Sequence, residues 1–149
     1  MKEIRQAWYD LVAADGTIRG LTGYTAADHR IYKDNPPFQV DTTVAKPAHI
    51  THTVSTPGGI DMSKYVYGAQ TEDVIIEVNV WADTQDRADD IAERLTVLLR
   101  DRHWDLTTYR AMTTDKEAEE SIDDIHETTG EINFYRKYLR WRLRDVYIK

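Results

Sequence analysis

Residues 134–148 read FYRKYLRWRLRDVYI and alternate between cationic and apolar side chains. Successive side chains of a β-strand point to opposite faces, so this period of two predicts a strand with two unlike faces. One face carries the arginine row, which we define as Arg136, Arg140, Arg142 and Arg144. The other face carries Tyr135, Leu139, Trp141, Leu143 and Tyr147. Because an apolar face of this kind must pack on a core, the strand is predicted to lie in a sheet with a packed layer against it.

A second strand and a long helix form the centre of the predicted fold. Residues 74–82 place apolar side chains at every second position, which predicts a strand with one continuous buried face. Asp83 or Thr84 then fits the cap position of a helix, with Asp86 near its positive end. An apolar stripe at helical spacing predicts that this helix runs through residues 86–99.

The other predicted elements are shorter. Apolar residues at helical spacing predict an amphipathic helix at residues 4–12, which Asp15-Gly16 ends. Runs rich in β-branched or aromatic residues predict strands at 30–32, 49–56 and 104–113.

Two stretches are predicted to be flexible loops. Residues 57–73 contain glycines and exposed-looking tyrosines, and residues 114–131 form a hydrophilic, mostly acidic connection. The resulting pattern predicts an α+β fold in a single domain, residues 1–149. Its sheet is expected to be mostly antiparallel or mixed, packed by one long helix and one short N-terminal helix.

Composition excludes several function classes. The chain has 149 residues, a formal net charge of −7 at pH 7 and no cysteine. It therefore has no disulfide framework and no thiol nucleophile. Its start, MKEIRQAWYDLVAAD, lacks a long apolar run, and no eighteen apolar residues run together, so we expect neither a signal peptide nor a membrane partner. The acidic balance disfavours a general nucleic-acid binder, which would need clustered cations.

Catalytic, metal and cofactor sites are not predicted. His49 and His52 are three apart on a strand, so their imidazoles should point to opposite faces and not share an ion. The acids of residues 83–90 lie mostly on the polar side of a helix, and those of 115–127 form a like-charge run. Neither arrangement resembles the paired carboxylates of acid–base catalysis. We therefore expect no enzyme, no metal and no cofactor.

The arginine row is the strongest candidate for function, and the sequence leaves three interpretations open. The row could pair with acids on a neighbouring strand of the same chain. It could instead pair across a subunit boundary with the acidic segment of a neighbouring copy, a head-to-tail contact that closes into rings. It could also face DNA that passes without sequence readout. The acidic residues considered for the subunit contact are Glu117, Glu119, Glu120, Asp123 and Asp124.

The order of these patterns resembles a known family. The features that carry the resemblance are the short N-terminal helix, Arg30-Ile31-Tyr32 before a proline turn, Pro47-Ala48-His49-Ile50, the strand end Val78-Asn79-Val80-Trp81, the helix with spaced alanines, and the arginine-rich last strand. Together they resemble the tail-completion, or tail-terminator, proteins of long-tailed bacteriophages. The resemblance covers nearly the whole chain, although the 57–73 and 115–131 segments depart from the shortest members.

The resemblance implies a virion structural protein that caps the tail tube and joins the tail to the head. It implies a hexameric ring of copies of this chain, contacts with the tail-tube and head-connector proteins, and a lumen where DNA passes close by. It places the protein in the tail or neck of the virion, assembled in the host cytoplasm. The loop residues Lys64, Tyr65 and Tyr67 become candidates for contact with the tube, because tyrosine offers apolar area and a polar tip.

Two alternatives remain from the sequence. A neck or head-completion protein would share the same features. A small-ligand-binding enzyme that uses the 57–73 loop as a lid would instead require an apolar pocket with converging polar groups near that loop.

Overall fold

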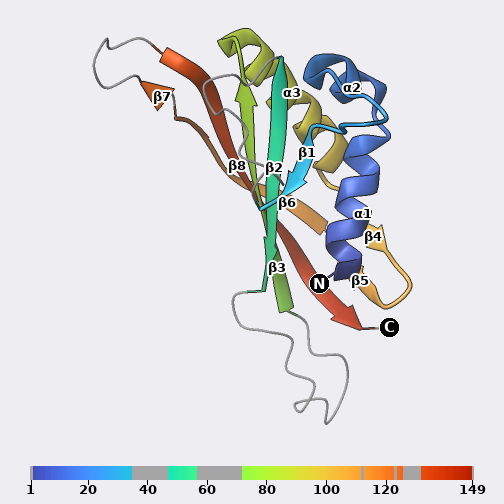
Figure 1. Cartoon of the computed structure of the whole chain (residues 1–149). Coiled ribbons are helices and arrows are strands. Elements are labelled where there is room, and N and C mark those ends of the chain that lie inside the picture. The colour runs from blue at the N-terminus through green and yellow to red at the C-terminus, as the bar shows by residue number, and fades with distance from the viewer. Residues whose placement is uncertain are drawn as a thin grey trace.

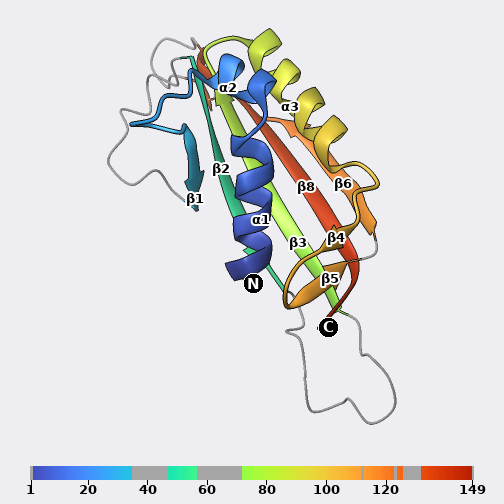
Figure 2. The same ribbon diagram turned by 90° about the vertical axis from the view of Figure 1, so that its right-hand side faces the viewer.

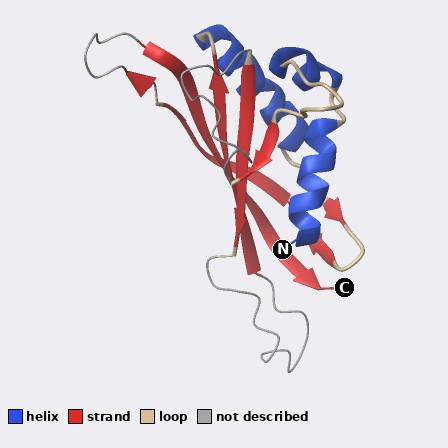
Figure 3. Cartoon of the chain, in the orientation of Figure 1, coloured by secondary structure: helices blue, strands red, loops and turns tan. Residues whose placement is uncertain are grey.

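Helices cover one face of a β-sheet, as the views in Figures 1 and 2 show. The computed structural model describes residues 2–34, 47–56, 72–111, 113–122, 124–125 and 132–148. The helices of this part of the chain are α1 (Lys2–Ala13), α2 (Gly16–Thr22) and α3 (Gln85–Leu99). Figure 3 separates the two layers by colour, with the helices on one side of the strands. The fold is α+β, as the sequence pattern predicts.

The described strands join in one sheet of order β1-β2-β3-β8-β5-β4, with β6 and β7 also paired to β8. They are β1 (Ile31–Lys33), β2 (Ala48–Ser55), β3 (Glu72–Ala82), β4 (Trp104–Asp105), β5 (Tyr109–Ala111), β6 (Thr113–Ser121), β7 (Asp124–Ile125) and β8 (Ile132–Ile148). The β1–β2 pair is parallel and the other pairs are antiparallel. The sheet is therefore mixed and mostly antiparallel, as predicted.

The core lies between the helices and the inner faces of β2, β3 and β8. Alternate residues of β3 from Val74 to Ala82 are fully buried, and so are the central apolar residues of β8 and most of the stripe on α3. The members with no exposed surface include Val74, Ile76, Val78, Val80, Leu139, Trp141, Leu143, Ile91, Leu95 and Leu99. α1 adds Trp8, which is also fully buried. The period of two on the strands and the helical stripe thus meet in one core, which confirms both predictions.

The alternation on β8 changes at Asp145. This residue has a φ of 55°, and the pairing with β3 shifts there, from Val74 opposite Leu143 to Glu72 opposite Val146. The bulge lets Leu143 and Val146 both point into the core with no exposed surface. The strict alternation predicted as far as Tyr147 therefore ends two residues earlier.

Asp15-Gly16 ends α1 as predicted, but it also begins α2, a helix that the sequence pattern did not predict. The Asp15 carboxylate accepts a hydrogen bond from the Ile18 backbone N–H at 2.9 Å, which caps the new helix. Gly23, with a φ of 72°, ends it. A helix of seven residues offers too few turns for a clear apolar period.

Residues 104–113, predicted as one strand, contain the two strands β4 and β5 and the first residue of β6. The strands β4 and β5 form a short hairpin in which Trp104 pairs with Ala111. Trp104 is buried and donates its indole N–H to the hydroxyl of Thr114 at 2.7 Å. The tight turn between Asp105 and Tyr109 carries no glycine or proline, so no sequence signal predicts it.

The prediction of a loop at 114–131 is wrong for residues 114–121 and 124–125, which form strands, whereas residues 123 and 126–131 lie outside the described part of the chain. Strand β6 occupies Thr113–Ser121 and pairs with β8 from Thr113 opposite Arg144 to Ser121 opposite Lys137. Most of the other predicted loop, residues 57–71, lies outside the described residues, whereas Glu72 and Asp73 begin β3. No helix of the described chain is both long and apolar enough to cross a membrane.

Candidate functional site

The arginine row lies on the sheet face opposite the helices. Strand β8 has β3 on one side and β6 on the other. Its odd-numbered residues from 139 to 143 fill the core, so the arginines at even positions point outward. Register then decides which side chains from β3 and β6 stand beside the row.

Arg140, Arg142 and Arg144 of the row each pair with acids of the same chain. Arg140 lies between Glu77 of β3, at 3.9 Å, and Glu117 of β6, at 3.0 Å. Arg142 bonds the same Glu117 and, on the β3 side, Asp73 at 3.0 Å. Glu117 therefore bridges two successive arginines. The arginines of β8 are thus flanked by acidic side chains of β3 on one side and of β6 on the other.

The last and first arginines of the row have different partners. Arg144 donates its Nε–H to the Asp115 carboxylate of β6. Arg136 donates to the side-chain oxygen of Asn79 at 2.8 Å, and its guanidinium lies 4.7 Å from the centre of the Trp81 ring. An arginine over a tryptophan face is held by the ring quadrupole without a carboxylate.

The pKa values follow these contacts. The hydrogen bond from Arg142 is the main reason that the pKa of Glu117 lies below its ordinary value. In return, hydrogen bonds to Glu117 and Asp73 raise the pKa of Arg142, and the hydrogen bond to Asp115 raises that of Arg144. Tyr138 donates its hydroxyl to Glu77 at 2.9 Å, and its pKa is raised by burial first and by that bond second.

Of the three interpretations that the sequence left open, pairing within one chain is the arrangement seen. The acids that meet the row come from both neighbouring strands: Asp73, Glu77, Asp115 and Glu117. Only Glu117 was among the predicted interface acids. Asp73 and Glu77 were missed, although Glu77 falls on the polar side of the alternating strand at 74–82, which was the available signal.

The other predicted site residues are not brought to the row. Glu119 lies beside Lys116, 3.5 Å away, and Glu120 is exposed. Residue 123 and the loop residues Lys64, Tyr65 and Tyr67 lie outside the described part of the chain, and Asp124 is described only as part of β7. Their proposed contacts are therefore unchanged by the structure.

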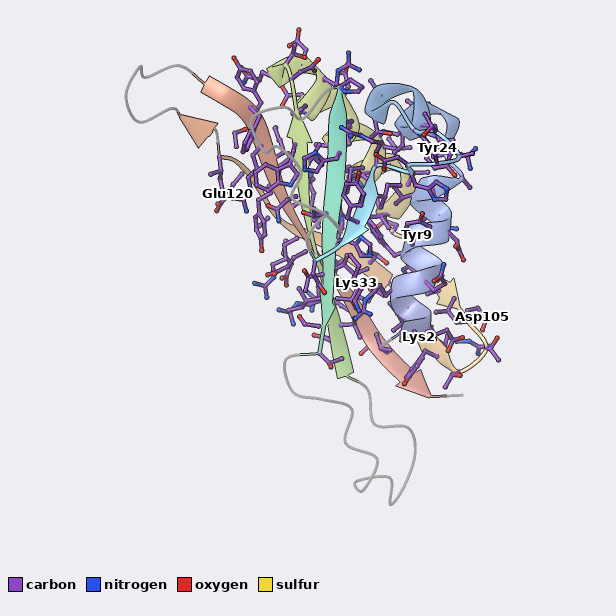
Figure 4. The ribbon with its side chains drawn as sticks, in the orientation of Figure 1. Lys2, Tyr9, Tyr24, Lys33, Asp105 and Glu120 are labelled. Atoms are coloured by element: carbon purple, nitrogen blue, oxygen red, sulfur yellow. The ribbon has the colours of Figure 1, made fainter. Side chains whose placement is uncertain are left out.

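Strand β6 is also an edge strand. It pairs with β8 on one side, and among the described strands it has no partner on the other. A bulge between Lys116 and Ala118 interrupts its regular ladder, and most of its side chains are charged. Both features are typical of edge strands that avoid unspecific pairing with the strands of other molecules. Figure 4 labels Glu120 on this side of the molecule, away from α1. Beyond it, Ile122 is 41% exposed.

At the other end of the same face, aromatic side chains replace the ion pairs. His49 is stacked on Trp81 with ring centres 5.8 Å apart, and Phe134 meets Trp81 edge-on at 4.8 Å. His52 points to the opposite face, where its ring lies 4.4 Å from that of Trp8. The two histidines thus lie on opposite faces of β2, as their spacing predicts.

Comparisons with known proteins support the fold. Over 99% of its length, this chain resembles a chain in the solved structure of the virion of a native gene transfer agent (GTA) particle, 96% of which is covered, with a TM-score of 0.68 and 15% identity. At that identity the likeness shows a shared fold. A second solved chain is 16% identical over 95% of both chains, but its TM-score of 0.48 carries no argument. No protein-family model and no curated protein matches the sequence.

Proposed function

We propose that this protein is a structural component of a phage-like particle that caps the tail tube and joins the tail to the head as a hexameric ring. The observation that carries the proposal is the likeness over nearly the whole of both chains to a chain of a gene transfer agent virion. The family resemblance of the sequence points to the same kind of particle. In this proposal the protein acts in the tail or neck, through contacts with its own copies, the tail-tube protein and the head connector.

The ion-pair network suits a rigid subunit. Cross-strand pairs connect β3, β8 and β6 on the exposed face, while the core connects them on the other. The network leaves the arginine row with little free charge, so the row braces the sheet. The contact with a neighbouring copy is then made by the edge strand β6 and the acids at its end, including Glu119, Glu120, Asp123 and Asp124.

The test is a pair of charge reversals with assembly as the readout. Glu120→Lys changes the exposed edge, and Asp90→Lys makes the same charge change on an exposed site of α3. We expect Glu120→Lys to lower the fraction of ring, measured by mass photometry with and without purified tail tubes, while Asp90→Lys assembles as the wild type. Normal rings and an unchanged salt dependence in Glu120→Lys would contradict the proposed edge contact.

A neck or head-completion protein would have the same fold and the same exposed face. The particle to which the protein binds distinguishes that role from a tail cap. A tail cap binds the ends of tails that lack a head, whereas a neck protein binds DNA-filled heads that lack a tail. Negative-stain images of the labelled protein mixed with each kind of particle separate the two. Binding to heads alone would reject the tail-cap role. The enzyme alternative depends on residues 57–73, and no observation on the described residues favours it.

A further inference from the structure

A basic hollow lies between α1 and the ends of β1 and β2. Its volume is about 270 Å³. The residues that line it, and that define the basic hollow, are Lys2, Arg5, Gln6, Tyr9, Lys33 and His52. Figure 4 labels Lys2 and Tyr9 on α1 and Lys33 at the end of β1. Lys33 is at least 28 positions from Lys2 and Arg5 in the sequence, yet the three cations line the same depression on an acidic protein.

The three cations of the basic hollow carry no counter-charge of their own. Within the described chain, Lys2, Arg5 and Lys33 form no ion pair within 4 Å, unlike Arg140, Arg142 and Arg144 of the row. Two acids lie nearby and accept hydrogen bonds from neutral groups, Asp34 from the Thr53 hydroxyl at 3.2 Å and Asp10 from the Gln6 amide at 2.8 Å, but neither forms an ion pair with the three cations. Like charges gathered without a partner repel, so a bound anion would relieve the cluster.

Two buried polar atoms of the lining also lack partners. His52 is 3% exposed, and its Nδ1 makes no hydrogen bond with any described group. The Nε of Arg5 is buried and without an acceptor in the same part of the structure. Burial and the nearby Arg5 lower the pKa of His52 to about 4, so its ring is neutral at physiological pH. Both side chains therefore bring polar groups to the floor of the basic hollow, beneath the cations of its rim.

The chemistry of the lining favours a phosphate group. The Arg5 Nε–H is a donor and needs an acceptor oxygen, and the neutral His52 ring offers either a donor or an acceptor at Nδ1. A hydrogen phosphate has both acceptor oxygens and an O–H, so it can pair with donors and with an acceptor of the lining. A carboxylate has acceptors only. Lysines serve phosphate as point charges, and α1 begins at Lys2, where helix N–H groups favour anions.

We propose that the basic hollow is a binding site for a phosphate group, held by Arg5, Lys33 and Lys2 over the floor formed by His52. This inference is independent of the tail-cap role. It would hold for a free phosphate ion or for a phosphomonoester presented by a small molecule.

The test is a titration of the full chain with inorganic phosphate at constant ionic strength, followed by NMR. Saturable shifts are expected in the amide signals of residues 2–9 and 33–34 and in the ring signals of His52. Thermal unfolding should move to higher temperature in parallel, because a ligand of the folded state stabilises it. A phosphate-bearing nucleoside monophosphate and its parent nucleoside form a second arm, in which only the monophosphate should reproduce the shifts.

Variants locate the site. Arg5→Gln and Lys33→Gln should each weaken phosphate binding roughly tenfold, the effect of losing one charge-assisted hydrogen bond. The matched controls Arg100→Gln and Lys116→Gln remove exposed cations of another surface and should leave the affinity unchanged. If Arg5→Gln does not fold, Lys33→Gln carries the test, because its side chain is exposed.

Three results would overturn the proposal. One is equal shifts with chloride at the same ionic strength, which would show general screening. Another is equal affinity for acetate, which would remove the assignment to phosphate. The third is unchanged binding in Lys33→Gln together with lost binding in Lys116→Gln, which would move the site elsewhere.

Discussion

The arginine row and the basic hollow are both clusters of cations, but they are built in different ways. In the row, Arg140 and Arg142 form ion pairs with acids of two neighbouring strands, and Glu117 bridges them. In the hollow, Lys2 and Arg5 of α1 meet Lys33 of β1, and no described acid bonds them. The density of cations in a sequence therefore does not show whether their charge is free.

The largest expected effect concerns the buried histidines beside these clusters. Burial lowers the pKa of His49 and His52 to about 4, from an ordinary 6.5. The unfolded chain therefore binds more protons than the folded one between pH 6.5 and 4, and stability falls as the pH falls through that window. The slope is about 1.4 kcal/mol per pH unit for each histidine, so the loss should reach several kcal/mol, roughly 3–6. Urea unfolding at a series of pH values measures it.

Single variants separate the two histidines. His52→Gln removes the titrating group under the hollow and should remove about half of the slope. His103→Gln makes the same substitution at an exposed histidine on another surface and serves as the control variant. A flat stability curve between pH 6.5 and 4.5 in the wild type would contradict the assignment of both lowered pKa values.

A smaller effect is expected from Glu117→Lys in the row. The change removes the bridge between Arg140 and Arg142 and puts a third cation between them, so the free energy of unfolding should fall by about 1 kcal/mol or more. Asp90→Lys on α3 makes the same charge change away from the row and serves as the control. The midpoint of urea unfolding is the measurement. Equal midpoints for the two variants would show that the network contributes nothing to stability.

The smallest expected effect has the opposite sign and lies in the hollow. Lys33→Gln removes one of three unpaired cations and should stabilise the phosphate-free protein by roughly 0.2–0.5 kcal/mol in low salt. At about 0.5 M salt the gain in stability should vanish, because exposed charges are then screened within about 4–5 Å. A destabilised Lys33→Gln in phosphate-free buffer would show that Lys33 has a partner, and would end the contrast with the row.

Much of the fold could be predicted from the sequence, because burial imposes a period. The strand at 74–82 and the helix at 86–99 each present one apolar face, and the structure buries both. β6 was missed for the same reason. Its sequence, TTDKEAEES, has no apolar face, and what holds it in the sheet is the β8 backbone and the arginines opposite its acids.

The site was predicted only in part. The arginine row follows from residues 134–148 alone, but the choice between partners in the chain and partners in a neighbouring copy depends on register, which no local pattern contains. The basic hollow could not be predicted at all. Lys2 and Lys33 meet because α1 packs beside β1 and β2, and an isolated lysine gives no signal in a sequence.

Which faces of the strands and helices are apolar follows from the order of residues alone, because the periods of two and 3.6 are properties of the local backbone. That order therefore determined the core, the α+β class and the outward direction of the arginines. Only the tertiary structure decided which charges are neutralised and which are left unpaired. Coulomb energy depends on distance in space, and that distance is set by strand register and by the side of the sheet on which a helix packs.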